Sequence, residues 1–401
     1  MQTFGAFLVS LVALSGLVAA RPTNPTGIFS ITTTHNRHFK PSGPLALAKA
    51  YRKFNKPLPK TLANAIGRLS RRQDTGSVVT KPQESDVEYL SAVQIGTPAQ
   101  TVYLDFDTGS SDLWVFSSET QANQVKGQAV YKPHKSSSAK KLTGASWSIE
   151  YGDHSSSNGD VWTDIVSIGG LSVKNMAVEN AKKVSQQFSD NAACSGLLGL
   201  GFSNLNTVRP TQQKTFFDMA MPNLKEPLFT ANLKHKADGT YNFGYIDGSE
   251  HSGPIVYTNV DSSQGGWTFT SPGYAVGDDE LNSESMTGIA DTGTTLLLLP
   301  DDVVTAYYNK IQGSSFDNNN GGYVFPCKAT PPDFKFGVED SSIKIPGSYL
   351  SFAPVDESGE SCFGGLQSSS GIGVNIFGDV ALKAALVVFD GGNNQLGWAQ
   401  K

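Results

Sequence analysis

The sequence has little charge and little cysteine for its length. Only 17% of the 401 residues are charged, and three are cysteine. Three cysteines exclude a small fold held together by several disulfides, and no C-x-x-C pair offers a zinc site. The six histidines show no metal-ligand spacing either. We therefore expect no metal and no other cofactor.

Long apolar runs are also missing, apart from one at the N-terminus. Residues 4–20 are uncharged and apolar, and they end in Val18-Ala19-Ala20, the small residues that a signal peptidase needs. The run is short for a membrane-spanning helix and lacks a basic flank. We therefore predict that residues 1–20 are a signal peptide cleaved after Ala20, and that the protein is secreted, extracellular and without a membrane partner.

Acidic residues are absent from the segment that follows. Residues 21–72 contain 11 Lys and Arg, whereas the rest of the chain has 20 basic and all 36 acidic residues, a net charge of −16. A basic arm could bind nucleic acid, but a secreted protein does not meet DNA. The segment ends at the dibasic pair Arg71-Arg72, a suitable site for a processing protease. We therefore interpret residues 21–72 as a removable prosegment and Gln73 as the start of the mature chain.

The mature chain reads as mostly β structure in more than one globular unit, because its length exceeds what one core usually organises. It contains most of the 41 glycines and 20 prolines, and alternating apolar patterns predict several strands. Helix signals are few. The expected strands are 88–95, 101–106, 146–151 and 170–179, and the expected helices are 211–220 and 302–311, the second with Asp301 as N-cap.

An internal repeat organises the chain. Residues 104–111 (LDFDTGSS) are echoed 184 positions later by 288–295 (GIADTGTT). Each copy is followed downstream by two apolar residues and a glycine, at 197–200 (LLGL) and 376–379 (IFGD). One Asp-Thr-Gly is weak evidence, but two with matching surroundings are not an accident.

The repeat predicts two related lobes, residues 73–251 and 252–401, each contributing one carboxylate. If the two turns meet across a pseudo-twofold axis, Asp107 meets Asp291, and two such carboxylates share one proton. The ionised member can take a proton from a bound water while the protonated member polarises a peptide carbonyl. This chemistry is that of a hydrolase with no covalent intermediate and no metal.

The residues beside the two carboxylates suit this task. The glycines allow tight turns close to the carboxylates, Ser and Thr hydroxyls can orient the outer oxygens, and the central threonines can hydrogen-bond across the lobe interface. For a single turn, an ordinary polar Asp turn would explain the pattern equally well. The expected orienting residues are Thr108, Gly109, Ser110, Thr292, Gly293 and Thr294.

Together these motifs resemble a pepsin-family aspartic protease of the secreted fungal type represented by penicillopepsin and aspergillopepsin. The resemblance covers nearly the whole chain, including residues 107–115, 151–153, 196–202, 291–295, 377–379 and 388–390. Aspartic proteases are themselves the established example of a proton-sharing dyad. The resemblance implies a bilobal β fold with pseudo-twofold-related lobes and a central peptide-binding cleft, and an acid endopeptidase made as a zymogen.

The resemblance also assigns the hairpin tip Tyr151-Gly152-Asp153 to a flap over the cleft, with the Tyr151 hydroxyl near the indole of Trp114. The residues alone favour an exposed turn there. The family prefers bulky hydrophobic residues at the P1 and P1′ positions of the substrate. Fungal relatives with this Tyr-Gly-Asp accept Lys at P1, so Asp153 is expected to pair with a Lys stem that fills the apolar pocket. The alternative is that Asp153 only supports the turn.

Further implications concern the cysteines and partners. Cys327 and Cys362 match a disulfide that the family places in the second lobe, which leaves Cys194 as a buried, inert thiol. By the same resemblance a prosegment lysine reaches the dyad, and Lys53 is the candidate. The expected partners of this monomer are extended polypeptide substrates and its own prosegment as inhibitor, with no nucleic acid.

Two other functions fit parts of the sequence. Residues 105–108 (DFDT) begin like the D-x-D-x-T loop of aspartyl-phosphate phosphatases, but Gly109 replaces the final Thr, and the second Asp-Thr-Gly remains unexplained. A non-catalytic pepsin-like binding protein typically lacks one catalytic Asp or the flap Tyr, whereas this sequence has Asp107, Asp291 and Tyr151.

Overall fold

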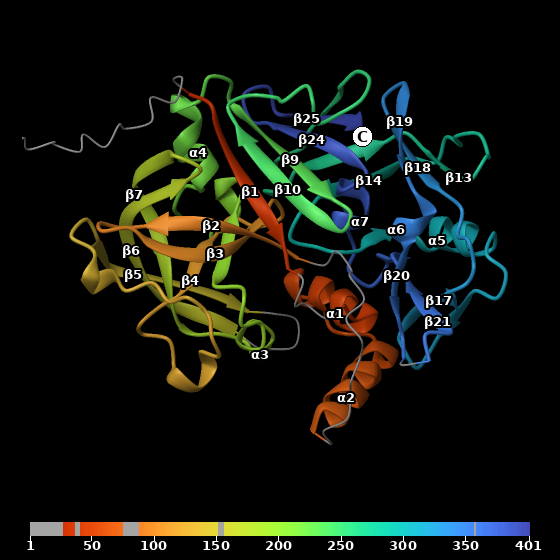
Figure 1. Ribbon diagram of the computed structural model, residues 1–401, viewed down its shortest axis with the longest axis horizontal. Helices are drawn as coiled ribbons and strands as arrows, with labels where there is room; N and C mark the ends of the chain where they lie inside the picture. Colours follow the sequence, from red (N-terminus) through yellow and green to blue (C-terminus); the bar gives the residue numbers. More distant parts are fainter. Residues whose placement is uncertain (1–26, 37–40, 75–87, 151–155, 357) are drawn as a thin grey trace, which may run out of the picture.

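The structure is a computed structural model that describes residues 27–36, 41–74, 88–150, 156–356 and 358–401. Ala20 and the residues expected to form a flap, Tyr151, Gly152 and Asp153, lie outside the described residues. The protein is mostly β, with 43% strand and 17% helix, as the sequence predicts (Figure 1). Among the described helices, none is long and apolar enough to cross a membrane.

One large sheet of 13 strands extends through most of the molecule. It takes strands from both ends of the chain, so it includes residues on both sides of the lobe boundary expected at 251–252. In sheet order the strands are β11 (Val256–Asn259), β25 (Gln395–Gln400), β24 (Ala385–Asp390), β9 (Leu228–Lys234), β10 (Ala237–Phe243), β1 (Phe29–His35), β2 (Tyr89–Ile95), β3 (Gln100–Asp107), β8 (Gly196–Gly199), β4 (Leu113–Phe116), β7 (Leu171–Lys183), β6 (Ser156–Ile168) and β5 (Lys140–Glu150).

Three smaller sheets build the C-terminal half. The first contains β12 (Thr268–Ser271), β14 (Met286–Ala290), β23 (Asn375–Phe377), β15 (Leu297–Leu299) and β22 (Leu366–Ser368). The second contains β13 (Tyr274–Val276), β18 (Phe334–Val338) and β19 (Ser341–Ile345). The third contains β16 (Ser315–Asp317), β17 (Gly322–Pro326), β21 (Ser361–Gly364) and β20 (Ser351–Pro354).

The internal repeat is confirmed by strand order and direction. In the first half β2, β3, β8, β4 and β7 are neighbours, joined by antiparallel, parallel, antiparallel and parallel pairing in turn. In the second half β12, β14, β23, β15 and β22 follow the same order with the same directions. Each half therefore places its Asp-Thr-Gly turn at the end of an equivalent central strand.

The helices are short except in the basic segment. They are α1 (Gly43–Lys53), α2 (Lys60–Asp74), α3 (Gln186–Ser189), α4 (Phe216–Ala220), α5 (Asp301–Tyr308), α6 (Gly347–Leu350) and α7 (Asp379–Leu382). The sequence interpretation missed α1 and α2. Arg71 and Arg72 belong to the last turn of α2.

Two helix boundaries were predicted wrongly. The helix expected at 211–220 begins only at Phe216, because the Thr215 hydroxyl caps it by accepting from the Asp218 backbone N–H (3.2 Å). The expected N-cap Asp301 is itself the first helical residue, and Pro300 is the N-cap. The Asp301 carboxylate instead accepts hydrogen bonds from the hydroxyls of Ser368 and Ser370.

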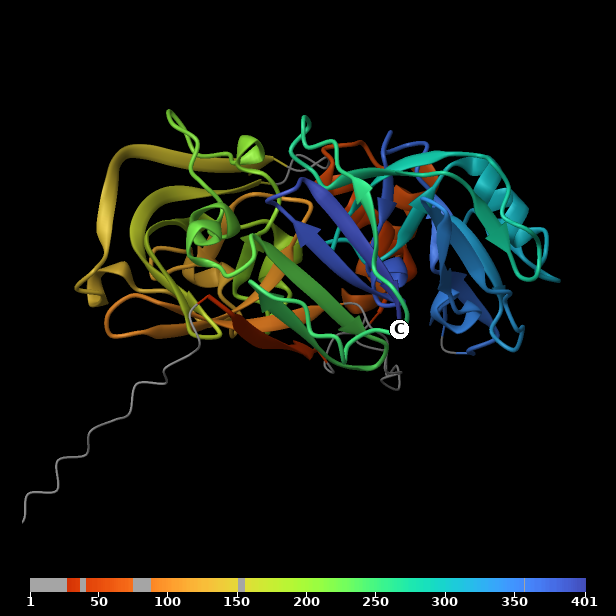
Figure 2. The same cartoon turned by 90° about the horizontal axis from the view of Figure 1, so that it is seen from above.

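The basic segment is part of the fold. Its strand β1 lies between β10 and β2 in the large sheet, and α1 lies between the two halves (Figures 1 and 2). The apolar face of α1 packs on the second half, where Leu47 and Tyr51 share a buried cluster with Phe363 and Ile376. Gly43 allows this close approach, because a Cβ there would collide with the Phe363 ring.

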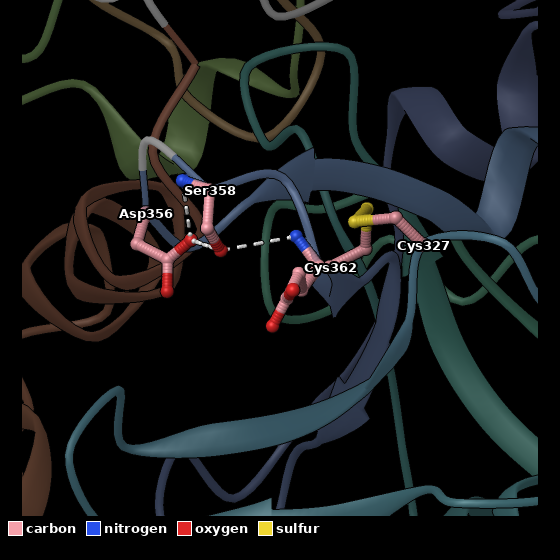
Figure 3. Close-up of a disulfide and its surroundings, with 5 residues drawn as sticks. Cys327, Asp356, Ser358 and Cys362 are labelled. Carbon is pink, nitrogen blue, oxygen red and sulfur yellow. Dashed lines mark hydrogen bonds between the residues drawn. A yellow bond between two sulfur atoms is a disulfide. The ribbon is translucent and has the colours of Figure 1, made fainter.

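The predicted disulfide is confirmed. Cys327, directly after β17, is bonded to Cys362 in β21 (Figure 3). Closing a loop of 35 residues stabilises the folded state by roughly 3–4 kcal/mol in the chain-entropy description. Cys194 is a buried free thiol whose pKa is raised by burial, which agrees with the expected inert role.

Candidate active site

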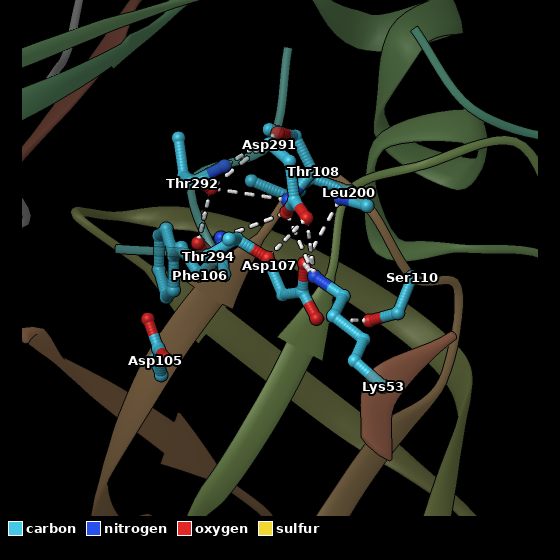
Figure 4. Close-up of polar contacts among 12 residues, drawn as sticks. Lys53, Asp105, Phe106, Asp107, Thr108, Ser110, Leu200, Asp291, Thr292 and Thr294 are labelled. Carbon is cyan, nitrogen blue, oxygen red and sulfur yellow. Dashed lines mark hydrogen bonds and ion pairs between the residues drawn. The ribbon is translucent and has the colours of Figure 1, made fainter. Parts of the chain in front are cut away.

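The two repeated aspartates lie together between the halves. Asp107 ends β3, and Asp291 directly follows β14. The same amine, that of Lys53, lies within hydrogen-bond distance of both side chains, and the two aspartates are only 3% and 0% exposed. Figure 4 shows both carboxylates pointing toward the same point, where the end of Lys53 lies.

Each carboxylate is held by its own turn in the same way. Asp107 Oδ1 accepts from the Gly109 N–H (2.9 Å), and Asp107 Oδ2 accepts from the Ser110 hydroxyl (2.6 Å). Asp291 Oδ1 accepts from the Gly293 N–H (3.0 Å), and Asp291 Oδ2 from the Thr294 hydroxyl (2.7 Å). The four donors fix the planes of the two carboxylates before any substrate arrives.

The two glycines are required because each lies against the opposite carboxylate. A Cβ on Gly109 would stand 2.5 Å from Asp291 Oδ1. A Cβ on Gly293 would collide with Asp107 Oδ1 and would stand 2.7 Å from the Lys53 amine. A larger residue in either turn would therefore separate the carboxylates.

The central threonines join the halves reciprocally. The Thr108 N–H donates to Thr292 Oγ1 and the Thr292 N–H donates to Thr108 Oγ1, both at 3.0 Å. The hydroxyls donate onward, from Thr108 to the Ala290 carbonyl (2.8 Å) and from Thr292 to the Phe106 carbonyl (2.5 Å). All four bonds are buried, so they fix the distance between the two turns.

Lys53, the last residue of α1, occupies the point between the carboxylates, as expected. Its amine donates to Asp107 Oδ1 (2.7 Å) and to both Asp291 oxygens (2.7 and 2.9 Å). Burial alone would raise the pKa of Asp107, but the Lys53 ammonium and the Ser110 hydroxyl hold that pKa below its usual value. The pKa of Asp291 is raised by burial and by the Asp107 charge, against the pull of Lys53.

A cavity of about 570 Å³ surrounds this point. Its walls are largely apolar and come from both halves, with Trp114 and Phe188 on one side and Ile289 and Val374 on the other. Lys53 and Phe54 of the basic segment also line it. Among the described residues, no cluster of His, Cys, Asp and Glu could hold a metal ion.

Trp114 lies in the wall of the cavity. Its indole is buried and packs against Trp147 (5.9 Å between ring centroids) and edge-on against Phe188 (4.8 Å). The indole N–H has no hydrogen-bond acceptor among the described residues. The partner expected for it, Tyr151, lies outside those residues, as do Gly152 and Asp153.

A further carboxylate near the dyad was not singled out from the sequence as a site residue. Asp105 is two positions before Asp107 on β3, and its Oδ2 lies 3.6 Å from the amine of Lys49 on α1. Burial and the charges of Glu88 and Asp107 raise the pKa of Asp105 to about 7, against the pull of Lys49. The two-residue period of a strand, which puts Asp105 and Asp107 on one face, could have revealed it.

Comparisons with known proteins agree with this geometry. Residues 88–401 match the family model described as eukaryotic aspartyl protease. The chain is 55% identical over 389 residues to endothiapepsin of Cryphonectria parasitica, covering 96% of this chain and 93% of that protein. It is 50% identical over 400 residues to aspergillopepsin-1 of Aspergillus oryzae, covering 98% of both chains.

Other similarities extend the same result. Penicillopepsin-2 of Penicillium janthinellum is 45% identical over 407 aligned positions, which cover 100% of this chain and 99% of that protein. The crystal structure of an aspartic proteinase from Irpex lacteus is similar with a TM-score of 0.64 and 25% identity, over 79% of this chain and 94% of that one. The sequence matches therefore include the basic segment as well as both halves.

Proposed function

The chain belongs to the eukaryotic aspartyl protease family and is an aspartic endopeptidase, and we propose that it is secreted as a monomeric zymogen and hydrolyses peptides at acid pH. Neither the phosphatase nor the binding-protein alternative is favoured, because the family model spans both Asp-Thr-Gly turns and the dyad geometry is intact. Secretion is supported by the apolar residues 4–20 and by similarity to fungal proteases over nearly the whole chain.

One observation carries the proposed mechanism. The Lys53 amine lies within hydrogen-bond distance of both carboxylates, so a water at the same place could also contact both. With the prosegment gone, the pair would hold one proton. The ionised carboxylate would take a proton from that water, and the protonated one would donate to the peptide carbonyl. The roles would then reverse to protonate the leaving amine.

The first prediction tests the dyad. Asp107→Asn and Asp291→Asn should each lower kcat by at least about a thousandfold, because an amide can neither accept the water's proton nor share the remaining one. Hydrolysis of a peptide at acid pH measures this. The matched control is Asp160→Asn. Asp160 is a buried acid in the same half as Asp107 and is ion-paired with Lys141 and Lys182.

The N-terminus of each dyad variant should be determined by mass spectrometry, so that failed processing is distinguished from failed hydrolysis. A correctly processed variant with wild-type kcat would contradict the two-carboxylate mechanism. Loss of wild-type activity on adding a chelator would contradict it as well. Equal loss in Asp160→Asn would show that the substitutions damage the fold rather than the chemistry.

We further propose that residues 21–72 keep the zymogen inactive until the pH falls. Lys53 occupies the position proposed for the catalytic water, and the segment's net charge of +11 is opposite in sign to the net charge of −16 on the mature chain. The lowered pKa of Asp107 means that its pairing with Lys53 is complete above the ordinary Asp value and is lost as pH falls through the lowered value. Following cleavage of the Arg72–Gln73 bond by mass spectrometry, together with activity, should show release at pH 3 and latency at pH 7.

The substrate preference is proposed from the apolar cavity and from Asp153. Trp114, Ile149 and Phe188 favour bulky hydrophobic residues at P1 and P1′, and Asp153 would allow Lys at P1. A partly exposed pair of this kind is worth about 1–2 kcal/mol, or roughly ten- to thirtyfold in kcat/KM. When Lys and Leu are compared at P1 of one peptide, the Asp153→Ser variant should selectively lose cleavage after Lys. Equal loss for both peptides would mean that Asp153 is only structural.

A further inference from the structure

Two buried acids lie at one wall of the active-site cavity, where Asp112 is a lining residue and Glu179 is not. Asp112 stands between the Asp107 turn and β4, and Glu179 is on β7, in register with Trp114 of β4. They are only 4% and 1% exposed, and the same nitrogen, Asn206 Nδ2, donates to one oxygen of each, so the two carboxyl groups lie close together. The chemistry assigned to the dyad does not use either of them.

The donors around this pair satisfy one negative charge, not two. Asn206 Nδ2 donates to Asp112 Oδ1 (2.8 Å) and to Glu179 Oε1 (2.9 Å), and the Thr207 N–H also donates to Asp112 Oδ1 (2.8 Å). Glu179 Oε2 is buried and receives no donor among the described residues. A carboxylate oxygen in that position would remain unsatisfied, whereas a protonated one can donate to Asp112.

The nearby cation does not neutralise the second charge. Arg209 attracts the Asp112 carboxylate at longer range, but its guanidinium donates to the carbonyls of Asn206 and Val208 (3.1 and 2.9 Å). Burial raises the pKa of Asp112. The pKa of Glu179 is raised further, because the negative charge of Asp112 adds to the effect of burial. The pair is therefore set to retain a proton at pH values where an exposed Glu has lost it.

The same pair is tied to the catalytic turn. The Gly199 N–H donates to the Asp112 carbonyl (2.9 Å), and the next N–H, of Leu200, donates to the Asp107 carbonyl (2.8 Å). Asn206 Nδ2 also contacts the Ser111 carbonyl (3.3 Å). A second charge on the pair would push apart Asp112 and Glu179, and with them the backbone that carries Asp107.

The second half provides a built-in comparison. The residue five positions after Asp291 is the buried Leu296, and the residue paired with Leu298 on β22 is Gln367. Gln367 uses its amide to donate to the carbonyls of Tyr323 (3.0 Å) and Gly364 (2.9 Å). The second half thus fills both positions without a titrating group.

We propose that Asp112 and Glu179 share one proton and form a pH-sensitive latch that holds the Asp107 turn and sets the upper pH limit of the active structure. Because the pKa of Glu179 is raised in the folded state, the stabilisation is complete below the ordinary Glu value and is lost as pH rises toward the raised value. Because one proton is lost, the equilibrium constant between the active and the inactivated structure changes by up to tenfold per pH unit.

The test uses the active enzyme as secreted from an expression host. Samples are held at pH values from about 5 to 8, and residual activity is measured at about pH 4 relative to each variant's own starting activity. Glu179→Gln keeps an amide donor toward Asp112 and removes the second charge. It should slow inactivation at about pH 7 by roughly tenfold and flatten its pH dependence. Asp160→Asn, a buried acid whose pKa is lowered by its two lysines, should leave that dependence unchanged.

A second variant keeps the proposal testable if Glu179→Gln does not fold. Asp112→Asn can donate its own amide to Glu179, and it should likewise flatten the pH dependence. The infrared band of a protonated carboxyl that the wild type has and the folded variant lacks should persist above pH 5 and decrease with the same midpoint as inactivation. If either folded variant inactivates with the wild-type pH dependence, or if no such band is present, the latch is wrong. These outcomes do not depend on the dyad mechanism. If that mechanism is wrong, inactivation can still be followed as loss of tertiary structure by near-ultraviolet circular dichroism.

Discussion

The two halves of the molecule hold the same dyad in different surroundings. Both Asp-Thr-Gly turns make matching hydrogen bonds, and both central strands have neighbours in the same order. The buried positions around them differ. Where the first half has acids, the second has neutral residues at the repeat-equivalent places: Asp105 against Ile289, Asp112 against Leu296, and Glu179 against Gln367.

One position reverses this pattern. After β23 the second half has the buried Asp379, where the first half has Leu200 after β8. Burial raises the pKa of Asp379 well above the ordinary value. The comparison therefore teaches that symmetry is kept where two carboxylates must meet, whereas the supporting residues are free to differ. Because the first half has the larger share of buried acids, we expect its stability to depend more strongly on pH than that of the second half.

The largest effect is expected from making the second half resemble the first. Gln367→Glu should lower the free energy of unfolding by about 3–5 kcal/mol near neutral pH, because a buried carboxylate would face two carbonyls that now accept from the amide. In acid the protonated side chain restores one donor, so the loss should fall to about 1–2 kcal/mol. The raised pKa of the new group gives this sign: stability decreases as pH rises.

The matched control for this comparison is Gln367→Leu, which removes the same hydrogen bonds without adding a titrating group. Denaturant unfolding at several pH values should show pH-dependent destabilisation for Gln367→Glu and a constant one for Gln367→Leu. Equal pH dependence in the two variants would mean that buried charge does not explain the difference between the halves.

A smaller, symmetric effect is expected at the threonines. Thr108→Val removes an acceptor from the Thr292 N–H and a donor from the Ala290 carbonyl, and Thr292→Val does the same to the Thr108 N–H and the Phe106 carbonyl. Each should lower the free energy of unfolding by about 2–3 kcal/mol. The two values should agree within about 1 kcal/mol in urea unfolding. A difference much larger than that would break the equivalence of the halves at their interface.

The sequence reveals the repeat because each copy is short and contiguous. Asp-Thr-Gly and its flanking apolar residues lie within eight positions, so the order of residues along the chain is enough to find them. It is less informative about the basic segment, where α1 and α2 were missed. The apolar face of α1 is buried against Phe363 and Ile376, more than 300 positions away, so its stability comes from tertiary packing rather than from local pattern.

Sequence alone predicts the pair of Asp-Thr-Gly turns, the mostly β class and, through resemblance, the Cys327–Cys362 disulfide. The position of Glu179 beside Asp112 depends instead on folding, because parallel pairing of β4 with β7 brings together residues 67 positions apart. The same is true of Lys49 beside Asp105. The physical reason is that the protonation of a buried acid depends on which charges and donors the fold gathers around it, and no local pattern in the sequence records those distances.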